Sequence, residues 1–155
     1  DADVKGSDNT RGVKSKAADH LIKHISSNPL LERPEIEGGP RPQELVLYRD
    51  SLTKTREMPA TLTLSGHGDP IEDHAALIDE RFVSTDKRAE KLYRMLEEGG
   101  PQTAHELARG TWGNIAVTQA FLTLSEVLGN LDILENDGRV APTEESDIVT
   151  YAVTA

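Results

Sequence analysis

The sequence contains no cysteine and few aromatic residues. None of its 155 residues is cysteine, and only 4% are Phe, Trp or Tyr, whereas 36% are hydrophobic. The absence of cysteine excludes disulfides and thiolate metal sites, so any bound zinc must be held by His, Asp or Glu. Because aromatic residues are scarce, we expect a core built of aliphatic side chains.

Long apolar runs and an excess of positive charge are also absent. No run approaches the roughly 18 residues that a membrane-spanning helix needs, and the first residues lack the apolar core of a signal peptide. The formal net charge is -10 at pH 7, from 17 Lys and Arg against 27 Asp and Glu. Such a surface does not attract phosphate backbones or anionic membranes. We therefore expect a cytoplasmic protein that binds neither DNA nor a membrane.

Three stretches have the apolar spacing of amphipathic helices, over residues 42–54, 73–96 and 114–130. The repeating positions are Leu45, Tyr48 and Leu52 in the first, Ile78, Phe82, Thr85, Ala89, Leu92 and Leu96 in the second, and Val117, Phe121, Leu124, Leu128 and Leu131 in the third. Residues 1–18 are polar and contain glycine, with too little apolar surface to offset the entropy of ordering, so we expect disorder there.

Shorter signals surround the third helix. The Thr-x-x-Glu pattern that opens residues 103–109 fits a capping box and predicts a short helix, followed by a turn. Asn-Asp-Gly at 136–138 predicts a hairpin turn, and alternation over 147–153 predicts a last strand. Helix, short helix, helix and hairpin is the order of a winged-helix domain, which we assign to residues 75–155.

The charge of this domain does not suit DNA. The helix predicted over 114–130, which would enter the major groove, contains no Lys or Arg and has Glu126 as its one charged residue. Residues 75–155 contain 14 acidic and 7 basic residues, a net charge of -7. We therefore expect a packing or substrate-shaping module and no DNA partner.

The stretch Thr61-Leu-Thr-Leu-Ser-Gly-His67-Gly-Asp-Pro70 combines a strand pattern with a glycine-flanked histidine. Thr and Leu alternate over residues 61–64, which predicts a short strand. Gly66 and Gly68 allow a sharp turn that presents His67 at the end of this strand. A histidine held there could bind a metal or transfer a proton. The spacing alone leaves open a histidine in an ordinary polar turn.

A second group of candidate ligands lies upstream. His20 and His24 are four residues apart, which places both on one face of a helix and matches a metal-pair spacing. No Glu lies beside His20 as it does in zinc proteases, so the pair alone does not specify a site. Asp19 precedes an apolar run and could be a helix N-cap. His105 falls in the first turn of a predicted helix, which favours a surface position.

Several of these stretches share their order and spacing with one known family. They are Ala18–Ile22, Ser27–Pro29, Ser65–His74, Leu77–Arg81, Leu124–Gly129 and Leu131–Glu135. Together they resemble the C-terminal part of metallo-β-lactamase-fold hydrolases, in the branch that ends in a winged-helix domain. The resemblance covers about residues 18–153. It implies an α+β chain, in which residues 19–74 are the C-terminal part of the hydrolase domain and the winged helix follows.

The resemblance also implies a metal site. Asp19 takes the place of a carboxylate that bridges two metal ions, and His67 takes the place of a ligand to the second ion. Two zinc ions held by carboxylate and imidazole groups lower the pKa of a shared water and polarise a carbonyl or phosphoryl group. The parent would hydrolyse an ester, thioester, lactam or phosphodiester bond in a small-molecule substrate.

The family's signature His-x-His-x-Asp-His is absent from these 155 residues. Since two ligands do not complete a zinc site, we expect a fragment that is inactive alone. Half of a hydrolase domain would expose apolar surface, so we also expect self-association. The alternative is a winged-helix protein-interaction module without enzymatic activity.

Overall fold

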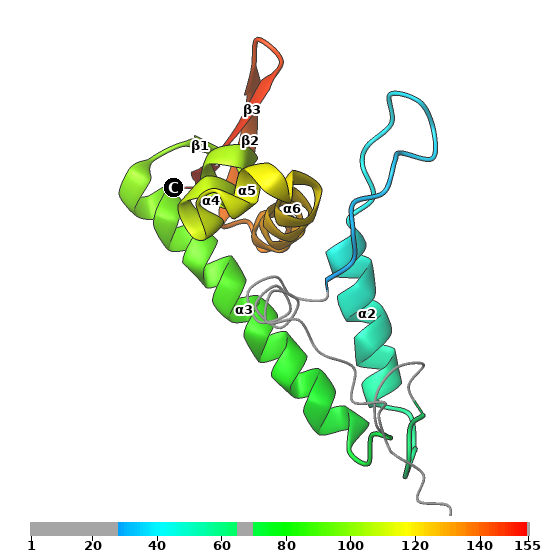
Figure 1. The fold of residues 1–155 in the computed structure, drawn as a ribbon. Coiled ribbons are helices and arrows are strands. Elements are labelled where there is room, and N and C mark those ends of the chain that lie inside the picture. The colour runs from blue at the N-terminus through cyan, green and yellow to red at the C-terminus, as the bar shows by residue number, and fades with distance from the viewer. Residues whose placement is uncertain (1–27, 65–69, 155) are drawn as a thin grey trace, which may run out of the picture.

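A computed structural model describes residues 28–64 and 70–154, which form an α+β structure (Figure 1). Within these ranges there are five helices and a three-stranded antiparallel sheet. The elements in chain order are α2 (Glu44–Arg56), α3 (His74–Gly99), β1 (Gln102–Thr103), α4 (Ala104–Trp112), α5 (Ile115–Thr118), α6 (Ala120–Asn136), β2 (Val140–Glu145) and β3 (Ile148–Val153). None of the helices in these ranges has the length and apolar content needed to cross a bilayer.

The long helix α3 confirms the stripe predicted over residues 73–96. Asp73 is its N-cap and accepts a hydrogen bond from the Ala76 backbone N–H at 2.9 Å. Its buried residues recur on one face, at Ile78, Thr85, Ala89, Leu92 and Leu96. The helix ends at Gly100, whose positive φ of 75° suits a residue without a Cβ.

The capping box that opens α4 is confirmed in both directions. The Thr103 hydroxyl accepts from the Glu106 N–H, and the Glu106 carboxylate accepts from the Thr103 N–H. The helix continues to Trp112, so the turn predicted at 110–113 is wrong for most of its length. Gly113, with a φ of 57°, follows the helix, because a residue without a Cβ adopts positive φ at little cost.

The single helix predicted over residues 114–130 is wrong in both its extent and its buried face. The chain forms α5 and then α6, which continues to Asn136. Val117 and Phe121, which the stripe predicted to be buried, are 57% and 55% exposed. The buried residues of α6 include polar ones, at Thr123, Ser125, Glu126, Val127, Gly129, Asn130, Leu131, Asp132 and Leu134. Because α2, α3 and α4 all contact α6, it is buried on more than one side.

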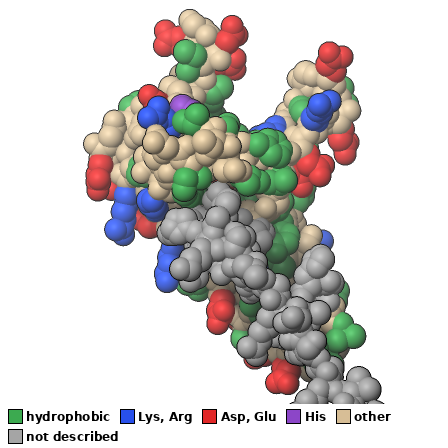
Figure 2. All heavy atoms as spheres, viewed as in Figure 1, with side chains coloured by type: hydrophobic (Ala, Val, Ile, Leu, Met, Phe, Trp, Pro, Cys, Tyr) green, Lys and Arg blue, Asp and Glu red, His purple; other side chains and the backbone are tan. Residues whose placement is uncertain are grey.

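The hairpin predicted around Asn-Asp-Gly at 136–138 is wrong, and the observed hairpin lies further along the chain, between β2 and β3. Asn-Asp-Gly at 136–138 ends α6, and the hairpin turn lies at Ser146 and Asp147, whose φ angles are 52° and 63°. β3 confirms the predicted last strand and lies between β1 and β2. The hairpin projects from the helices (Figure 1), and Figure 2 shows acidic side chains at its end.

The core lies where α3, α4 and α6 meet the sheet. Its fully buried large residues are Leu96, Leu107, Val127, Leu131 and Leu134. The helix predicted over 42–54 is confirmed as α2, which packs beside α3 and α6. The strand predicted over 61–64 is reduced to one bridge between Thr63 and Ile71, and none of the described strands pairs with it otherwise.

Candidate functional site

Both metal ligands expected from the resemblance, Asp19 and His67, lie outside the residues that the structure describes, as do His20 and His24. In the described ranges there is no group of three or more His, Asp or Glu side chains that could hold a metal ion. His105 is exposed in the first turn of α4, as expected. The structure describes residues on both sides of 65–69, the stretch that contains His67, and it begins nine residues after Asp19, at Asn28.

Thr63 and Ile71, which lie on either side of residues 65–69, form an antiparallel bridge. Thr63 and Ile71 exchange two backbone hydrogen bonds of 2.9 Å, which joins the two ends of residues 64–70. Two residues beyond Ile71, Asp73 caps α3. His74, the first residue of α3, buries its Nε2 without a hydrogen-bond partner among the described residues. The long helix α3 therefore begins three residues after the bridge at Ile71.

Asn28 and Leu31, near the start of the described residues, are held by α6. The Asn28 Nδ2 donates to the Glu126 Oε2 at 2.9 Å, and the Leu31 N–H donates to the Ser125 Oγ at 3.2 Å. Ser125 donates its own hydroxyl to the Phe121 carbonyl at 2.7 Å, which fixes its orientation. Two consecutive side chains of α6 thus bind two points of the amino-terminal segment.

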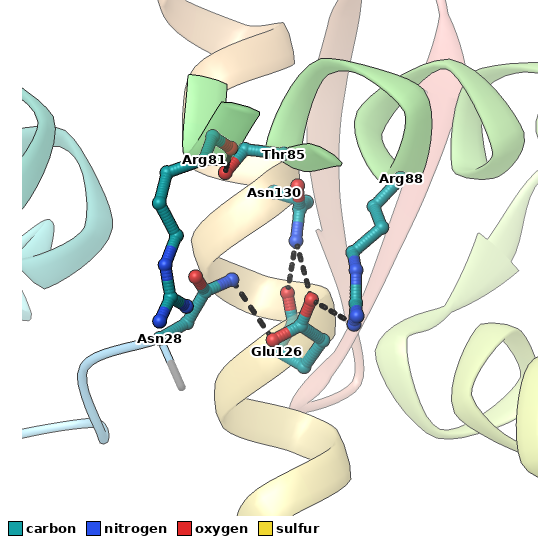
Figure 3. Close-up of polar contacts among 6 residues, drawn as sticks. All are labelled: Asn28, Arg81, Thr85, Arg88, Glu126 and Asn130. Atoms are coloured by element: carbon teal, nitrogen blue, oxygen red, sulfur yellow. Dashed lines mark hydrogen bonds and ion pairs between the residues drawn. The ribbon is translucent and has the colours of Figure 1, made fainter. Parts of the chain in front are cut away.

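Glu126 is the centre of a buried polar cluster, which we call the Glu126 cluster: Asn28, Arg88, Glu126 and Asn130. The carboxylate is 3% exposed, so its charge must be compensated by partners. Its Oε1 accepts from the Arg88 Nη1 at 2.7 Å and from the Asn130 Nδ2 at 3.4 Å. Figure 3 shows these side chains converging on Glu126 from three parts of the chain.

A small cavity adjoins the Glu126 cluster. Its volume is about 180 Å³, and its lining includes Arg88, Glu126 and Asn130, with Trp112 and Leu92 as apolar walls. The Asn130 Oδ1 is buried and has no partner among the described residues. Hydrogen bonds with bound water could satisfy such a group.

A second buried ion pair holds the segment that leads into α2. The Arg41 guanidinium donates to both carboxylate oxygens of Asp132, at 2.6 and 3.0 Å. The Asp132 side chain is 4% exposed. Burial raises the pKa of Asp132, and Arg41 opposes that shift. Burial and the Asp132 charge likewise raise the pKa of Glu135, and burial followed by Glu135 raises the pKa of Tyr151.

The Glu126 cluster and the Arg41–Asp132 pair bind residues 28–41 to α6. Neither was predicted from the sequence. The sequence shows Glu126 as the one charged residue of the helix predicted over 114–130, and the structure buries it and pairs it with Arg88. A charged residue within an apolar helix is itself a signal of burial, because it needs a partner there. Asn28 and Arg41 gave no comparable signal, since both lie in irregular segments before α2.

Comparison with known proteins identifies a relative that matches most of the chain. The chain is 36% identical over 133 residues, 86% of its length, to the probable metallo-hydrolase YqjP of Bacillus subtilis. The chain is homologous, over part of their length, to metallo-β-lactamase-family hydrolases. No protein-family model matches it. The homology implies a metal in the family, and it confirms the resemblance found in the sequence.

Two solved structures match in fold. A β-lactamase domain protein from Burkholderia ambifaria superposes with a TM-score of 0.63 and 26% identity, over 73% of this chain. A metallo-β-lactamase family protein from Thermus thermophilus gives a TM-score of 0.59 over 72% of this chain, at 24% identity. The chain spans 41% of the length of the Bacillus protein and 34% of each of these two structures.

Proposed function

We propose that this chain is the carboxy-terminal part of a metal-dependent hydrolase that acts on an ester, thioester, lactam or phosphodiester bond of a small molecule. The observation that carries the proposal is the 36% identity, over 86% of the chain, to a probable metallo-hydrolase. Because the chain spans well under half of that relative, the remaining part of the catalytic domain would come from elsewhere in the complete protein. The isolated chain would then be inactive.

Asp19 and His67 are the proposed metal ligands within this chain. The described residues do not by themselves fit a metal, since they offer no group of three candidate ligands. A carboxylate and an imidazole are donors that zinc accepts, and two zinc ions would supply an activated water and a Lewis acid. What the described residues contribute is support: the Thr63–Ile71 bridge on one side and the Glu126 cluster on the other.

We further propose that residues 75–155 are a winged-helix domain that forms a wall of the substrate cleft. Support comes from the order α3, β1, α4, α5, α6, β2, β3 and from the sheet order β1-β3-β2. Neither α5 nor α6 contains Lys or Arg, so a DNA-binding role is not proposed. The boundary between residues 74 and 75 stays a prediction, as does that at residue 18.

The test uses the complete protein that contains these residues. We expect about two metal ions per molecule, and hydrolysis of at least one member of a panel comprising a p-nitrophenyl ester, a thioester, nitrocefin and bis-p-nitrophenyl phosphate. Asp19→Ala and His67→Ala should abolish turnover and lower the metal content. His105→Ala is the matched control, because this exposed histidine of α4 should leave both unchanged. A metal-free protein without turnover would contradict the proposal.

A second candidate function is a winged-helix module that binds a protein partner without catalysis. The observation that favours it is the exposed apolar pair Val117 and Phe121, 57% and 55% accessible at the junction of α5 and α6. Self-association of the isolated chain is an expected property of such a surface. Sedimentation at increasing concentration, with Phe121→Gln for comparison, tests it: a monomer at all concentrations would count against self-association.

A further inference from the structure

The cavity beside the Glu126 cluster lies where α3, α4 and α6 meet, and its volume is about 180 Å³. An apolar cavity of about 150 Å³ holds a benzene molecule, so this space suits a ligand of about six heavy atoms. Its lining combines apolar walls, Leu92 and Trp112, with polar side chains that include Arg88, Lys91, Thr111 and Glu126. A few polar groups that converge in a pocket with apolar walls are typical of small-molecule sites.

The charges of the lining favour an anion. Arg88 and Lys91 contribute two positive charges and Glu126 one negative charge, which leaves a net charge of +1. The Glu126 carboxylate is already engaged, because its Oε1 accepts from Arg88 at 2.7 Å and its Oε2 accepts from Asn28 at 2.9 Å (Figure 3). Lys91 is exposed and forms no hydrogen bond or ion pair with the residues that the structure describes. The positive charge of Lys91 is therefore available to a ligand.

Hydrogen-bond donors accompany these charges. The Arg88 guanidinium has several N–H groups, and its Nη1 is the nitrogen that binds Glu126. The Thr111 hydroxyl donates to the Met95 Sδ at 3.6 Å, and a thioether sulfur is a weak acceptor. An oxygen atom of a ligand would be a stronger acceptor for this hydroxyl. Arg88, Lys91 and Thr111 thus bring donors to one small space.

The apolar walls restrict the kind of anion further. Leu92 is a buried core residue, and Trp112 packs against the same core. Walls of this kind favour a ligand with an alkyl chain over a fully polar anion such as phosphate, because burial of apolar surface is favourable. The lining therefore suits a small anion that has an apolar end.

We propose that this cavity binds a short-chain carboxylate, whose charged group contacts Arg88, Lys91 and Thr111 and whose alkyl chain packs against Leu92 and Trp112. None of these residues is a proposed metal ligand. The proposal does not rest on the proposed hydrolase function, and it gives the junction of α3, α4 and α6 a role in small-molecule binding.

The test follows the Trp112 indole N–H signal by heteronuclear NMR, because Trp112 is the one tryptophan of the 155-residue chain. This chain is titrated at neutral pH and constant ionic strength with butyrate, with its neutral isostere butyramide and with butylammonium. For butyrate we expect a saturable shift with a Kd of about 1 mM, which a ligand of this size allows. Butyramide and butylammonium should bind about tenfold more weakly, because they lack the negative charge.

Three variants locate the binding. Lys91→Gln removes an exposed charge and should weaken butyrate about threefold. Thr111→Val removes the hydroxyl but keeps the branched shape, and should weaken it about fivefold. Lys87→Gln is the matched control, because Lys87 lies one turn earlier on α3 and does not line this cavity. Arg88 is left unchanged, because its loss would leave the buried Glu126 carboxylate uncompensated.

Several outcomes would overturn the proposal. Equal affinities for butyrate and butyramide would show a cavity without preference for anions, and tighter binding of butylammonium would show that the Glu126 charge prevails. The absence of a saturable shift with butyrate would exclude the site. If Lys91→Gln and Thr111→Val bind butyrate no more weakly than Lys87→Gln does, the ligand does not occupy this cavity. None of these results bears on the metal content or turnover of the complete protein, so the proposed function is tested separately.

Discussion

Gly129 of α6 lies directly against Leu45 of α2, and the two helices meet at this point. A Cβ at position 129 would come within 2.9 Å of the Leu45 Cβ and 3.2 Å of its Cδ2. Leu45 is 2% exposed, so it is enclosed and has little room to move away. The absence of a side chain at 129 therefore sets the distance between α2 and α6.

The Gly129→Ala variant should be less stable than the wild type. Overpacking a close contact costs about 1–3 kcal/mol, and the higher helix propensity of Ala recovers up to ~1 kcal/mol. We expect a net loss of about 1–2 kcal/mol in the free energy of unfolding, measured by urea titration.

Gly110→Ala provides the matched control, because Gly110 also lies within a helix. Its Cβ would meet only the Met95 Cε, at 2.6 Å, and this end of a flexible side chain can move. The variant should be unchanged or more stable by up to ~1 kcal/mol. Equal destabilisation of both variants would exclude the Leu45 contact as the cause.

The capping box of α4 should make stability depend on pH. Hydrogen bonds from the Thr103 backbone and hydroxyl lower the pKa of Glu106 below its usual value of 4.5. A carboxylate with a lowered folded pKa stabilises the protein above its unfolded pKa, and this contribution is lost as the pH falls through the folded pKa.

Two variants test this contribution. Thr103→Ala should cost about 1 kcal/mol at pH 7, as the loss of an N-cap does. Glu106→Ala should destabilise at pH 7 and progressively less in acid, below about pH 4. Glu97→Ala, which removes an exposed carboxylate near the end of α3, should show no such trend. If Glu106→Ala lowers the free energy of unfolding by the same amount at every pH, the ionised Glu106 carboxylate does not contribute through its hydrogen bonds to Thr103.

The buried pair Arg41–Asp132 should be sensitive to loss of its cation. Burial already raises the pKa of Asp132 above 3.8, and Arg41 opposes this. Arg41→Ala leaves a carboxylate that is 4% exposed without its guanidinium, and should cost about 3 kcal/mol at pH 7.

The sign of the pH dependence follows from the raised pKa. A carboxyl group with a raised folded pKa favours the folded state in acid and loses this contribution as the pH rises through that pKa. The Arg41→Ala loss should therefore shrink between pH 7 and about pH 4.5, measured by urea unfolding. The exposed pair Arg56–Asp79 is the comparison, and Arg56→Ala should change little. The double variant Arg41→Ala, Asp132→Asn also removes the Asp132 charge. If it loses as much free energy of unfolding as Arg41→Ala alone, an uncompensated charge is not the cause of the loss.

The helices that pack one face against the rest of the chain were predictable from the sequence. α3 follows its 4, 3, 4, 3, 4 spacing because only one side of it is buried, and α4 follows its capping box because that signal is local. The hairpin turn at Ser146 and Asp147 was missed because Asn-Asp-Gly at 136–138 is the stronger signal, and it serves as a helix end.

The candidate site was predictable only through the resemblance, which names Asp19 and His67. The buried polar contacts that hold residues 28–41 against α6 were not predictable, because each joins residues that lie far apart in the sequence. Asn28 and Glu126 are 98 residues apart, and Arg41 and Asp132 are 91 apart. Sequence periodicity describes one element at a time, so it cannot show which irregular segment will cover a buried carboxylate.

Phe121 and Leu131 of α6 should contribute very differently to stability. The apolar spacing predicts that Phe121 and Leu131 belong to one buried face. In the structure Phe121 is 55% exposed and Leu131 is fully buried. Leu131→Ala should therefore cost about 2–5 kcal/mol through the cavity it creates, and Phe121→Ala should change the free energy of unfolding little. Urea unfolding of the two variants tests this difference. Comparable large losses in the free energy of unfolding would support the predicted apolar face, because Phe121 would then have to be packed inside the protein.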